Sequence, residues 1–273
     1  MRYIPKTIPY IIAEVGACHN NDLDEAIKLI DSSASAGCQA VKFQLYDAKR
    51  LSERRHAPEL FQAYYNYRLP YPWLPTLRDH AARCGLDFML SVYDEDDLLH
   101  AIDYADCFKI SSFESSDSVF LYTVAGACRF HGKWMAISTG LSTPGDLTRL
   151  RTIRDELSCP IAVLHCISSY PAACEELNLS VIHTEDLDGY SDHSADVLAG
   201  AFAVSVGANI LEVHVKSKHT SVTNPDWMHA LLPNMLADYV LFANKAYRMR
   251  GTGVRVVTPG EQANLRYKHT EGS

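Results

Sequence analysis

Eight short apolar runs mark this chain, and seven segments with helical spacing of apolar residues lie between or after them. The runs occupy residues 10–16, 40–44, 87–93, 107–112, 134–140, 161–166, 187–193 and 210–215. The helical segments occupy residues 24–36, 73–84, 95–103, 119–130, 143–157, 197–206 and 235–249. Runs that are apolar almost throughout are typical of parallel strands buried on both faces. The pattern therefore predicts an α/β protein built on a parallel sheet.

Eight strand–helix repeats favour a single-domain (β/α)8 (TIM) barrel, which we place at residues 1–250. The chain has 273 residues, enough for one such barrel of about 250 residues. A doubly wound sheet is the alternative, but the similar repeats and the lack of a glycine-rich dinucleotide loop count against it. Local signals agree, because Thr143-Pro144 is typical of a helix start and Gly37, Gly85 and Gly207 follow predicted helix ends.

Two segments fall outside this repeating pattern. Residues 46–72 form the longest irregular stretch, and they carry several tyrosines and arginines. Because they follow the second predicted strand, they would lie over the barrel mouth, either as a lid or as a surface for a partner. Residues 251–273 are polar and predict a loosely held C-terminal tail.

Composition narrows the class of function. The formal net charge is −8 and no basic run is present, which argues against a nucleic-acid surface. No apolar stretch is long enough to cross a bilayer, and the first residues do not form a signal peptide. The eight cysteines are scattered without a Cys-x-x-Cys pair, as expected for free thiols in a reducing compartment. We therefore expect a cytoplasmic protein that binds neither nucleic acid nor membrane.

Polar residues gather at the carboxyl ends of the predicted strands, where barrel enzymes place their chemistry. Lys42 and Lys109 stand inside apolar strands, which is costly unless each lysine is paired or binds an anion. Several hydroxyls lie nearby, and the Ser138-Thr-Gly140 turn adds backbone N–H groups at a helix start. The set predicts a pocket for a doubly charged phosphate, with a structural ion pair as the alternative for each lysine.

His193 and His214 end the seventh and eighth apolar runs. If these runs are adjacent parallel strands, the two imidazoles emerge side by side and suit a divalent transition metal. Ser191, Asp192 and Glu212 stand beside them. The alternative is that each histidine only caps its strand with a hydrogen bond.

The chain resembles the sialic acid (N-acetylneuraminate) synthase family, whose members condense phosphoenolpyruvate to make nine-carbon acids. The matching motifs occur in family order and at family spacing from residue 10 to residue 232, and together they are highly specific. They are Ile12-Ala-Glu-Val-Gly16, His19-Asn20, Ala40-Val-Lys-Phe-Gln44, Lys109-Ile-Ser-Ser-Phe-Glu114, Ile137-Ser-Thr-Gly140, Leu164-His-Cys166, Ser169-Tyr-Pro171, Asn178-Leu179, Gly189-Tyr-Ser-Asp-His193, Gly207-Ala208 and Glu212-Val-His214.

This resemblance implies a TIM barrel with a divalent metal held by His193 and His214, most often Mn²⁺, with Mg²⁺ or Co²⁺ as alternatives. It implies that Glu14 handles protons and that Lys42 and Lys109 are both catalytic and in contact with phosphoenolpyruvate. The further residues that it places on phosphoenolpyruvate are Ser112, Ser138, Ser168, Tyr170 and Ser191. The residues that it places toward the acceptor sugar are Glu114, Asp226, His19 and Asn20. A homo-oligomer, either a dimer or a tetramer, is expected with it.

The chain departs from the family pattern on the acceptor side. Family members usually carry a C-terminal antifreeze-like domain, from which an arginine reaches the partner subunit's site and binds the acceptor's N-acetyl group. This chain ends after Thr258-Pro-Gly-Glu261 and Leu265-Arg266, where that domain would begin, so we expect the catalytic barrel only. The altered motifs are His19-Asn20-Asn21 for His-Asn-Gly, Ser91-Val-Tyr-Asp94 for Ser-Thr-Pro-Phe, Glu212-Val-His-Val-Lys216 for Glu-Lys-His-Phe-Thr and Asn224-Pro-Asp-Trp227 for Gly-Pro-Asp-His. We therefore expect an acceptor other than N-acetylmannosamine.

These observations predict a metal-dependent transferase that joins phosphoenolpyruvate to an aldehyde or sugar acceptor, giving a 2-keto-3-deoxy acid and phosphate. A Schiff-base aldolase that uses Lys42 or Lys109 is the enzymatic alternative. A non-catalytic barrel that serves as the binding subunit of a partner enzyme is the other alternative.

Overall fold

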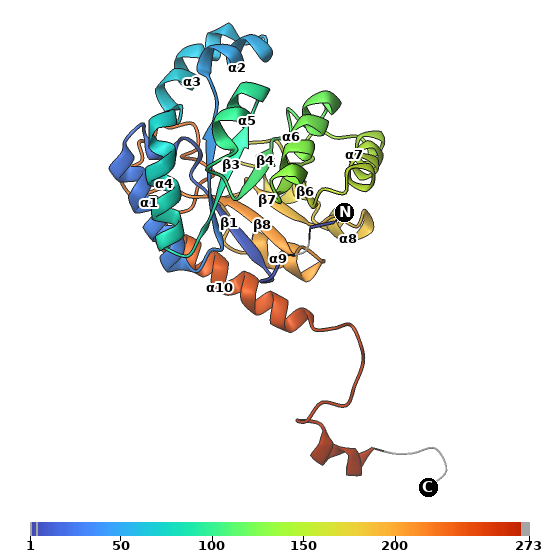
Figure 1. Cartoon of the computed structure of the whole chain (residues 1–273). Coiled ribbons are helices and arrows are strands. Elements are labelled where there is room, and N and C mark those ends of the chain that lie inside the picture. The colour runs from blue at the N-terminus through green and yellow to red at the C-terminus, as the bar shows by residue number, and fades with distance from the viewer. Residues whose placement is uncertain (1, 4, 269–273) are drawn as a thin grey trace.

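The computed structural model describes residues 2–3 and 5–268, which form a closed barrel of eight parallel strands surrounded by helices (Figure 1). The strands are β1 (Tyr10–Glu14), β2 (Ala40–Leu45), β3 (Asp87–Val92), β4 (Cys107–Ile110), β5 (Trp134–Ser138), β6 (Ile161–Cys166), β7 (Gly189–Asp192) and β8 (Ile210–His214). Each strand pairs with the next, and β8 returns to β1 with His214 opposite Glu14. The predicted (β/α)8 barrel is confirmed, and the closed sheet excludes a doubly wound one.

The outer helices follow the predicted segments within two residues at each end. They are α1 (Leu23–Ala36), α4 (Leu74–Arg83), α5 (Glu95–Ala101), α6 (Ser118–Phe130), α7 (Pro144–Leu157), α9 (Ala199–Ser205) and α10 (Pro233–Arg250), with a short α8 (Val181–Thr184) that we did not predict. Thr143 caps α7 through a reciprocal pair of contacts with Asp146. Gly37, Gly85 and Gly207 have positive φ angles after helix ends, as predicted.

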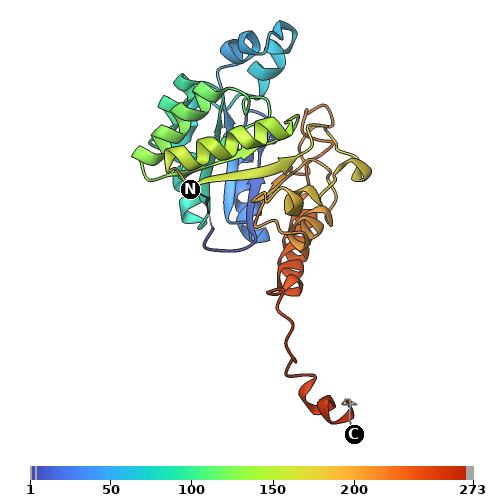
Figure 2. The same ribbon diagram turned by 90° about the vertical axis from the view of Figure 1, so that its right-hand side faces the viewer.

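Residues 46–72 are mostly helical, so our prediction of an irregular stretch was wrong. They contain α2 (Ala48–Arg54) and α3 (Phe61–Tyr67), joined by the 3-10 turn η2 (Pro58–Leu60) and followed by η3 (Tyr71–Trp73). Both helices have seven residues, too few to show a clear apolar period, and the Asp47 side chain caps α2 by accepting from the Arg50 N–H. The α2–α3 segment lies at the end of the barrel opposite to the C-terminal tail (Figures 1 and 2).

The barrel interior changes from apolar to polar from the amino ends to the carboxyl ends of the strands. Toward the amino ends, an apolar cluster fills it, consisting of Tyr10, Ile12, Ala40, Met89, Cys107, Trp134, Ala136, Ala162, Leu164 and Ile210. Two residues further along a strand the side chain points to the same face. At that position Ile12 is followed by Glu14, Ala40 by Lys42 and Ile210 by Glu212. Because every second side chain of a strand points into the barrel, a layer of polar side chains lies directly above the apolar cluster.

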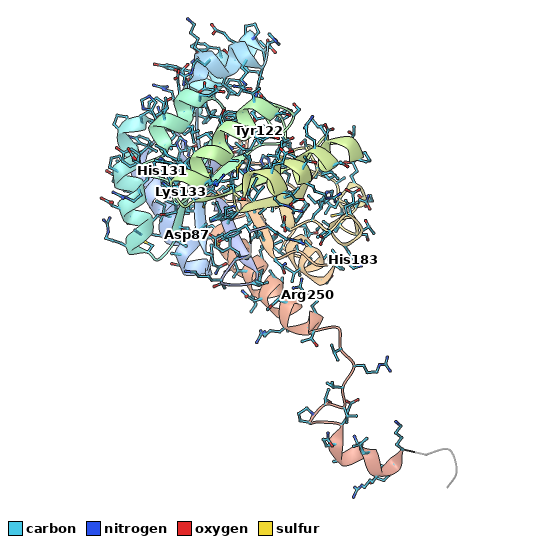
Figure 3. All side chains as sticks on the ribbon, turned by 45° about the vertical axis from the view of Figure 1, so that its right-hand side comes forward. Asp87, Tyr122, His131, Lys133, His183 and Arg250 are labelled. Atoms are coloured by element: carbon cyan, nitrogen blue, oxygen red, sulfur yellow. The ribbon has the colours of Figure 1, made fainter. Side chains whose placement is uncertain are left out.

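At the amino ends of the strands, away from α2 and α3, side chains make ordinary structural contacts. Asp87 accepts a hydrogen bond from the Tyr10 hydroxyl, and Arg250, at the end of α10, donates to the Val204 carbonyl oxygen at 2.9 Å. Figure 3 labels Asp87 and Arg250 at this end, away from α2 and α3. We predicted a tail at residues 251–273; residues 269–273 lie outside the described part, and residues 251–268 are exposed and extend away from the barrel. Within the described residues, no helix is long and apolar enough to cross a membrane.

Candidate active site

A cavity of about 340 Å³ opens at the carboxyl ends of the strands. All eight strands supply one side chain of the polar layer to its wall: Glu14, Lys42, Ser91, Lys109, Ser138, Cys166, Ser191 and Glu212. Loops add further groups above this layer. The cavity gathers most of the residues that the sequence singled out, namely Glu14, Lys42, Lys109, Ser112, Ser138, Tyr170, Ser191, His193, His214 and Asp226.

Two lysines and two glutamates form a buried ionic network at the floor of the cavity. Lys42 Nζ lies 3.0 Å from Glu14 Oε2 and 3.5 Å from Glu212 Oε1. Lys109 Nζ lies 3.6 Å from Glu212 Oε2. Gln44 donates to Glu14 Oε1 at 2.7 Å, which orients that carboxylate. Each lysine is therefore ion-paired, as the structural alternative predicted, and each also faces the cavity.

Burial and charge set the protonation of this network. Burial by itself would lower the pKa of Lys42, but the charges of Glu14 and Glu212 outweigh it and raise that pKa. Burial lowers the pKa of Lys109, which has the weaker, single carboxylate contact. Burial would raise the pKa of Glu212, but Lys109 and Lys42 hold it well below its usual range. These shifts favour the charged forms of Lys42 and Glu212, whereas that of Lys109 favours its neutral amine.

One wall of the cavity is lined with hydroxyl groups. The Gly140 N–H donates to Ser112 Oγ at 3.0 Å, and a Cβ at Gly140 would lie only 2.7 Å from that oxygen and would overlap Ser168 Oγ. Residue 140 must therefore be glycine for the two serines to meet there. Ser138 Oγ and Ser168 Oγ are buried without a hydrogen-bond partner. Unsatisfied buried hydroxyls at a cavity suit a ligand with several acceptor oxygens.

His193 and His214 lie together at the ends of β7 and β8, with ring centroids 5.4 Å apart. His193 Nδ1 is 2.7 Å from the Ile167 carbonyl oxygen, which fixes that ring and leaves Nε2 for a ligand. His214 Nδ1 is buried without a hydrogen-bond partner. A third imidazole, His229, has its ring centroid 4.4 Å from that of His214. This donor set fits a divalent transition metal, for which neutral imidazole and carboxylate are suitable ligands.

Asp226 faces these rings from the loop after β8. Its Oδ2 accepts from the Ala17 N–H at 2.7 Å, and a Cβ at Gly16, where φ is +51°, would overlap the same oxygen. Burial would raise the pKa of Asp226, but contact with His214 holds it well below its usual range. Burial lowers the pKa of His229 to about 3. The loop therefore presents an ionised carboxylate and a neutral imidazole to the cavity.

The other residues that we predicted for the site lie outside the cavity lining. Asn20 Oδ1 accepts from Asn224 Nδ2 at 3.0 Å and so supports the loop that carries Asp226. His19 is buried, with its ring packed edge-on against Trp73 at 6.0 Å, and burial lowers its pKa to about 4. Ser168 lies behind Gly140.

Glu114, the fourth of these residues, lies in a neighbouring cavity beside α2. Its Oε1 accepts from Arg55 Nη2 at 2.9 Å. Arg55 lines both the main cavity and this second one, which has a volume of about 720 Å³ and is also bordered by Tyr64 and Phe113. Arg55 therefore connects the space next to the ionic network with the space next to Glu114.

Several cavity residues were not assigned to the site from the sequence. Gln44, Ser91 and Glu212 follow Lys42, Met89 and Ile210 at the two-residue spacing of a strand, so strand alternation would have found them. Tyr93 follows Ser91 at the same spacing. Arg55 lies in the turn directly after α2, a helix that we did not predict. His229 lies in a loop, and no local pattern marks it. These last two positions depend on how distant segments pack.

Comparison with known proteins identifies the family. The sequence model of the NeuB family matches residues 29–255. The spore coat polysaccharide biosynthesis protein SpsE of Bacillus subtilis is 34% identical over 80% of this chain and 64% of that protein. The N,N'-diacetyllegionaminic acid synthase of Campylobacter jejuni is 28% identical over 93% of this chain and 81% of that protein.

Solved structures agree with this assignment. The crystal structure of the N-acetylneuraminic acid (sialic acid) synthetase of Leptospira borgpetersenii, in complex with citrate, superposes with a TM-score of 0.85 at 27% identity, covering 96% of this chain and 91% of that one. The fold, the order of the motifs and the family match point the same way. This chain belongs to the NeuB family, which includes the sialic acid synthases.

Proposed function

We propose that this protein joins phosphoenolpyruvate to an aldehyde or sugar acceptor and releases a 2-keto-3-deoxy acid and inorganic phosphate. The observation that carries the proposal is the buried Glu14–Lys42–Glu212–Lys109 network, which lies in one cavity with His193 and His214. Two cations next to unsatisfied hydroxyls suit an anion with both a phosphate and a carboxylate group. Relatives named as an N,N'-diacetyllegionaminic acid synthase and an N-acetylneuraminic acid (sialic acid) synthetase support this substrate class.

In the proposed bound state, the phosphate and the carboxylate of phosphoenolpyruvate lie against Lys42, Lys109 and the serine wall. Ser112, Ser138 and Ser191 line the cavity and offer hydroxyl donors, and the Ser138-Thr-Gly140 turn offers backbone N–H groups. Ser168 lies just outside this lining, beside Gly140. Tyr170, which borders the mouth of the cavity, closes over the ligand. Without a ligand, Glu14 and Glu212 compensate the charges of the two lysines. A bound anion adds further compensating negative charge beside them.

The reaction proceeds by addition and elimination. The C2–C3 π electrons of the enol attack the acceptor carbonyl carbon, so a carbon–carbon bond forms and the carbonyl oxygen takes up a proton. Water adds to the electron-poor C2 and gives its proton to Glu14, which Gln44 and Lys42 hold in place. The bond between C2 and the bridging oxygen of the hemiketal phosphate then breaks, the C2 hydroxyl gives its proton to the departing phosphate, and the 2-keto group forms.

His193 and His214 would hold the divalent metal, with Asp226 nearby. When bound there, such an ion supplies Lewis-acid polarisation of the acceptor carbonyl. We propose Mn²⁺, with Mg²⁺ or Co²⁺ as alternatives. On this side of the cavity the chain's own residues position the acceptor, while Lys42 and Lys109 hold the donor.

A Schiff-base aldolase is the second candidate, because burial lowers the pKa of Lys109 and so favours the amine that this chemistry needs. That mechanism does not use the paired histidines. Borohydride treatment in the presence of pyruvate distinguishes the two candidates. A trapped adduct on Lys109 would favour the aldolase, and its absence with intact turnover of phosphoenolpyruvate would favour the synthase.

The acceptor pocket is the part that we propose to differ from the better known members. Arg55 and Glu114, with Tyr64 and Phe113, give the neighbouring space a charged and aromatic lining. The α2–α3 segment acts as a lid over it. We propose an acceptor other than N-acetylmannosamine, such as a smaller or nucleoside-linked aldehyde.

Phosphate release tests both the reaction and the acceptor. The metal-loaded protein is mixed with phosphoenolpyruvate and each member of a panel of aldehydes, aldoses and hexosamines, and phosphate is measured over time. We expect release only when an acceptor is present. N-acetylmannosamine should be a poor substrate; a kcat/KM near the ~10⁴ M⁻¹s⁻¹ lower end for ordinary enzymes would contradict this acceptor assignment.

A further inference from the structure

His229 is a buried histidine whose two ring nitrogens both lack a hydrogen-bond partner. It is 2% exposed, and its ring faces the cavity from the loop between β8 and α10. A buried imidazole normally donates from one nitrogen and accepts at the other. Two unsatisfied nitrogens on one buried ring therefore indicate a missing ligand rather than a role in packing.

The spacing of the three imidazoles suits one ion. A ring bound through nitrogen at about 2.1 Å has its centre roughly 3.2 Å from the metal, so two rings at tetrahedral or octahedral angles have centres about 4.5–5.3 Å apart. The observed centroid distances are 5.4 Å for His193–His214, 4.4 Å for His214–His229 and 5.9 Å for His193–His229. All three distances lie just outside this range, the first two by about 0.1 Å and the longest by about 0.6 Å, so the three rings are close to the spacing of ligands around one ion.

Asp226 lies at the distance expected of a fourth ligand. Its two oxygens are 3.7 Å from His214 Nδ1 and 3.6 Å from His229 Nε2. Both distances are too long for hydrogen bonds of about 2.7–3.2 Å. They are close to the roughly 3.0–3.4 Å that separates two donors bound to one ion at about 2.1 Å.

A second group of donors on the surface shows what a satisfied cluster looks like. Asp31, His80 and Cys84 are also close enough to surround an ion. There, however, His80 Nε2 is already 2.7 Å from Asp31 Oδ1, and Arg83 Nη2 lies 3.1 Å from His80 Nδ1. That imidazole has both nitrogens engaged and a cation beside it, whereas His229 has neither nitrogen engaged.

We propose that His229 is a third imidazole ligand of the metal centre, beside His193 and His214, with Asp226 as a carboxylate ligand. This inference rests on the proposed function, because it concerns the metal of the same site. A set of three imidazoles and one carboxylate favours borderline ions such as Co²⁺, Zn²⁺ and Fe²⁺ over Mg²⁺, which prefers oxygen ligands. The centre therefore binds Co²⁺ and Zn²⁺ much more tightly than Mg²⁺.

The number of bound imidazoles is measured directly on the full chain. The protein is stripped of metal and loaded with one equivalent of Zn²⁺, and X-ray absorption at the zinc edge counts histidine ligands by their ring scattering. We expect three imidazoles in the wild type and two in His229→Ala. Two imidazoles in the wild type would overturn the proposal, and this result does not depend on whether the variant folds.

Titration calorimetry with Co²⁺ alone gives the affinity. His229→Ala should bind Co²⁺ at least about 100-fold more weakly, since loss of supporting groups around a ligand already costs 10–100-fold. His219→Ala is the matched control, because His219 lies in the same loop but is exposed, and it should bind Co²⁺ as the wild type does. Equal affinities of wild type and His229→Ala would overturn the assignment.

A parallel titration of the metal-free wild type with phosphoenolpyruvate separates this inference from the proposed function. Phosphoenolpyruvate binding together with only two zinc-bound imidazoles would refute the third ligand and leave the proposed function intact. Three imidazoles without phosphoenolpyruvate binding would support the third ligand and refute the proposed function.

Discussion

The carboxyl end of the barrel has two halves that are built in different ways. One half, which we call the strand layer, consists of Glu14, Lys42, Lys109 and Glu212 on the strands themselves. The other half, which we call the rim, consists of Arg55, Glu114, Asp226 and His229 on turns and loops. Strand alternation and barrel register place every member of the strand layer.

The rim depends on contacts between residues far apart in the chain. Arg55 meets Glu114 across 59 positions, and Asp226 meets Ala17 across 209. The sequence departs from the pattern of the family that it resembles in four segments, residues 19–21, 91–94, 212–216 and 224–227, but it keeps Glu14, Lys42, Lys109 and Glu212 themselves. We infer that the strand layer, which would bind phosphoenolpyruvate, keeps its residues, whereas the rim, which would bind the acceptor, changes. The predictions that follow test this division, beginning with the largest expected effect.

Removal of a histidine at the junction of the halves should have the largest effect. His193→Ala or His214→Ala should lower kcat by at least ~10³-fold, because the loss of Lewis-acid stabilisation is worth several kcal/mol. Both variants should keep the wild-type circular dichroism spectrum, since the rings lie above the apolar core. Chelation by EDTA should inactivate the wild type, and Mn²⁺ or Co²⁺ should restore it. Full activity of the chelated, metal-free protein would be incompatible with the metal assignment.

Substitution in the strand layer should weaken the donor. Lys42→Met or Lys109→Met removes a charge-assisted contact and should weaken phosphoenolpyruvate binding by roughly 2–4 kcal/mol, measured by titration calorimetry. Lys49→Met is the matched control, because Lys49 is an exposed lysine of α2. If phosphoenolpyruvate bound both cavity variants as it binds the wild type, the two lysines would serve only the structure.

Substitution on the rim should affect the acceptor more than the donor. Arg55→Ala removes a cation that lines the cavity and should raise the acceptor KM by about 10-fold, the loss of one partly exposed charged contact of about 1–2 kcal/mol. The phosphoenolpyruvate KM should change less than threefold. Arg78→Ala is the control, because Arg78 on α4 pairs with Asp79 and lines neither the main cavity nor the one beside Glu114. An equal rise in both KM values would remove the distinction between the two halves.

The fold and the strand layer were accessible from the sequence for the same physical reason. Buried parallel strands leave long apolar runs, and a lysine or glutamate within such a run is conspicuous because its burial is costly. The register of a barrel then brings the marked residues together at one end. Lys42, Lys109 and Glu14 line the same cavity because each stands within an apolar run that the sequence shows plainly.

The rim was not accessible in this way. Helices α2 and α3 are too short to show a period, and their position depends on pairs such as Arg50 with Asp94, 2.6 Å apart. His229 follows no strand and stands in no motif, so only the folded chain brings it to His214. Asn20 belongs to a family motif that we placed toward the acceptor. In the structure it instead contacts Asn224, in the loop that carries Asp226.

The central claim is that phosphoenolpyruvate is condensed with an acceptor by breaking the bond between C2 and the bridging oxygen. Phosphoenolpyruvate labelled with ¹⁸O at that bridging position tests it, with the acceptor identified in the panel and the released phosphate analysed by mass spectrometry. The account predicts phosphate that appears only with the acceptor and retains the label, in equal amount to a new 2-keto acid. Phosphate without the label, or its release at the same rate without any acceptor, would contradict the account.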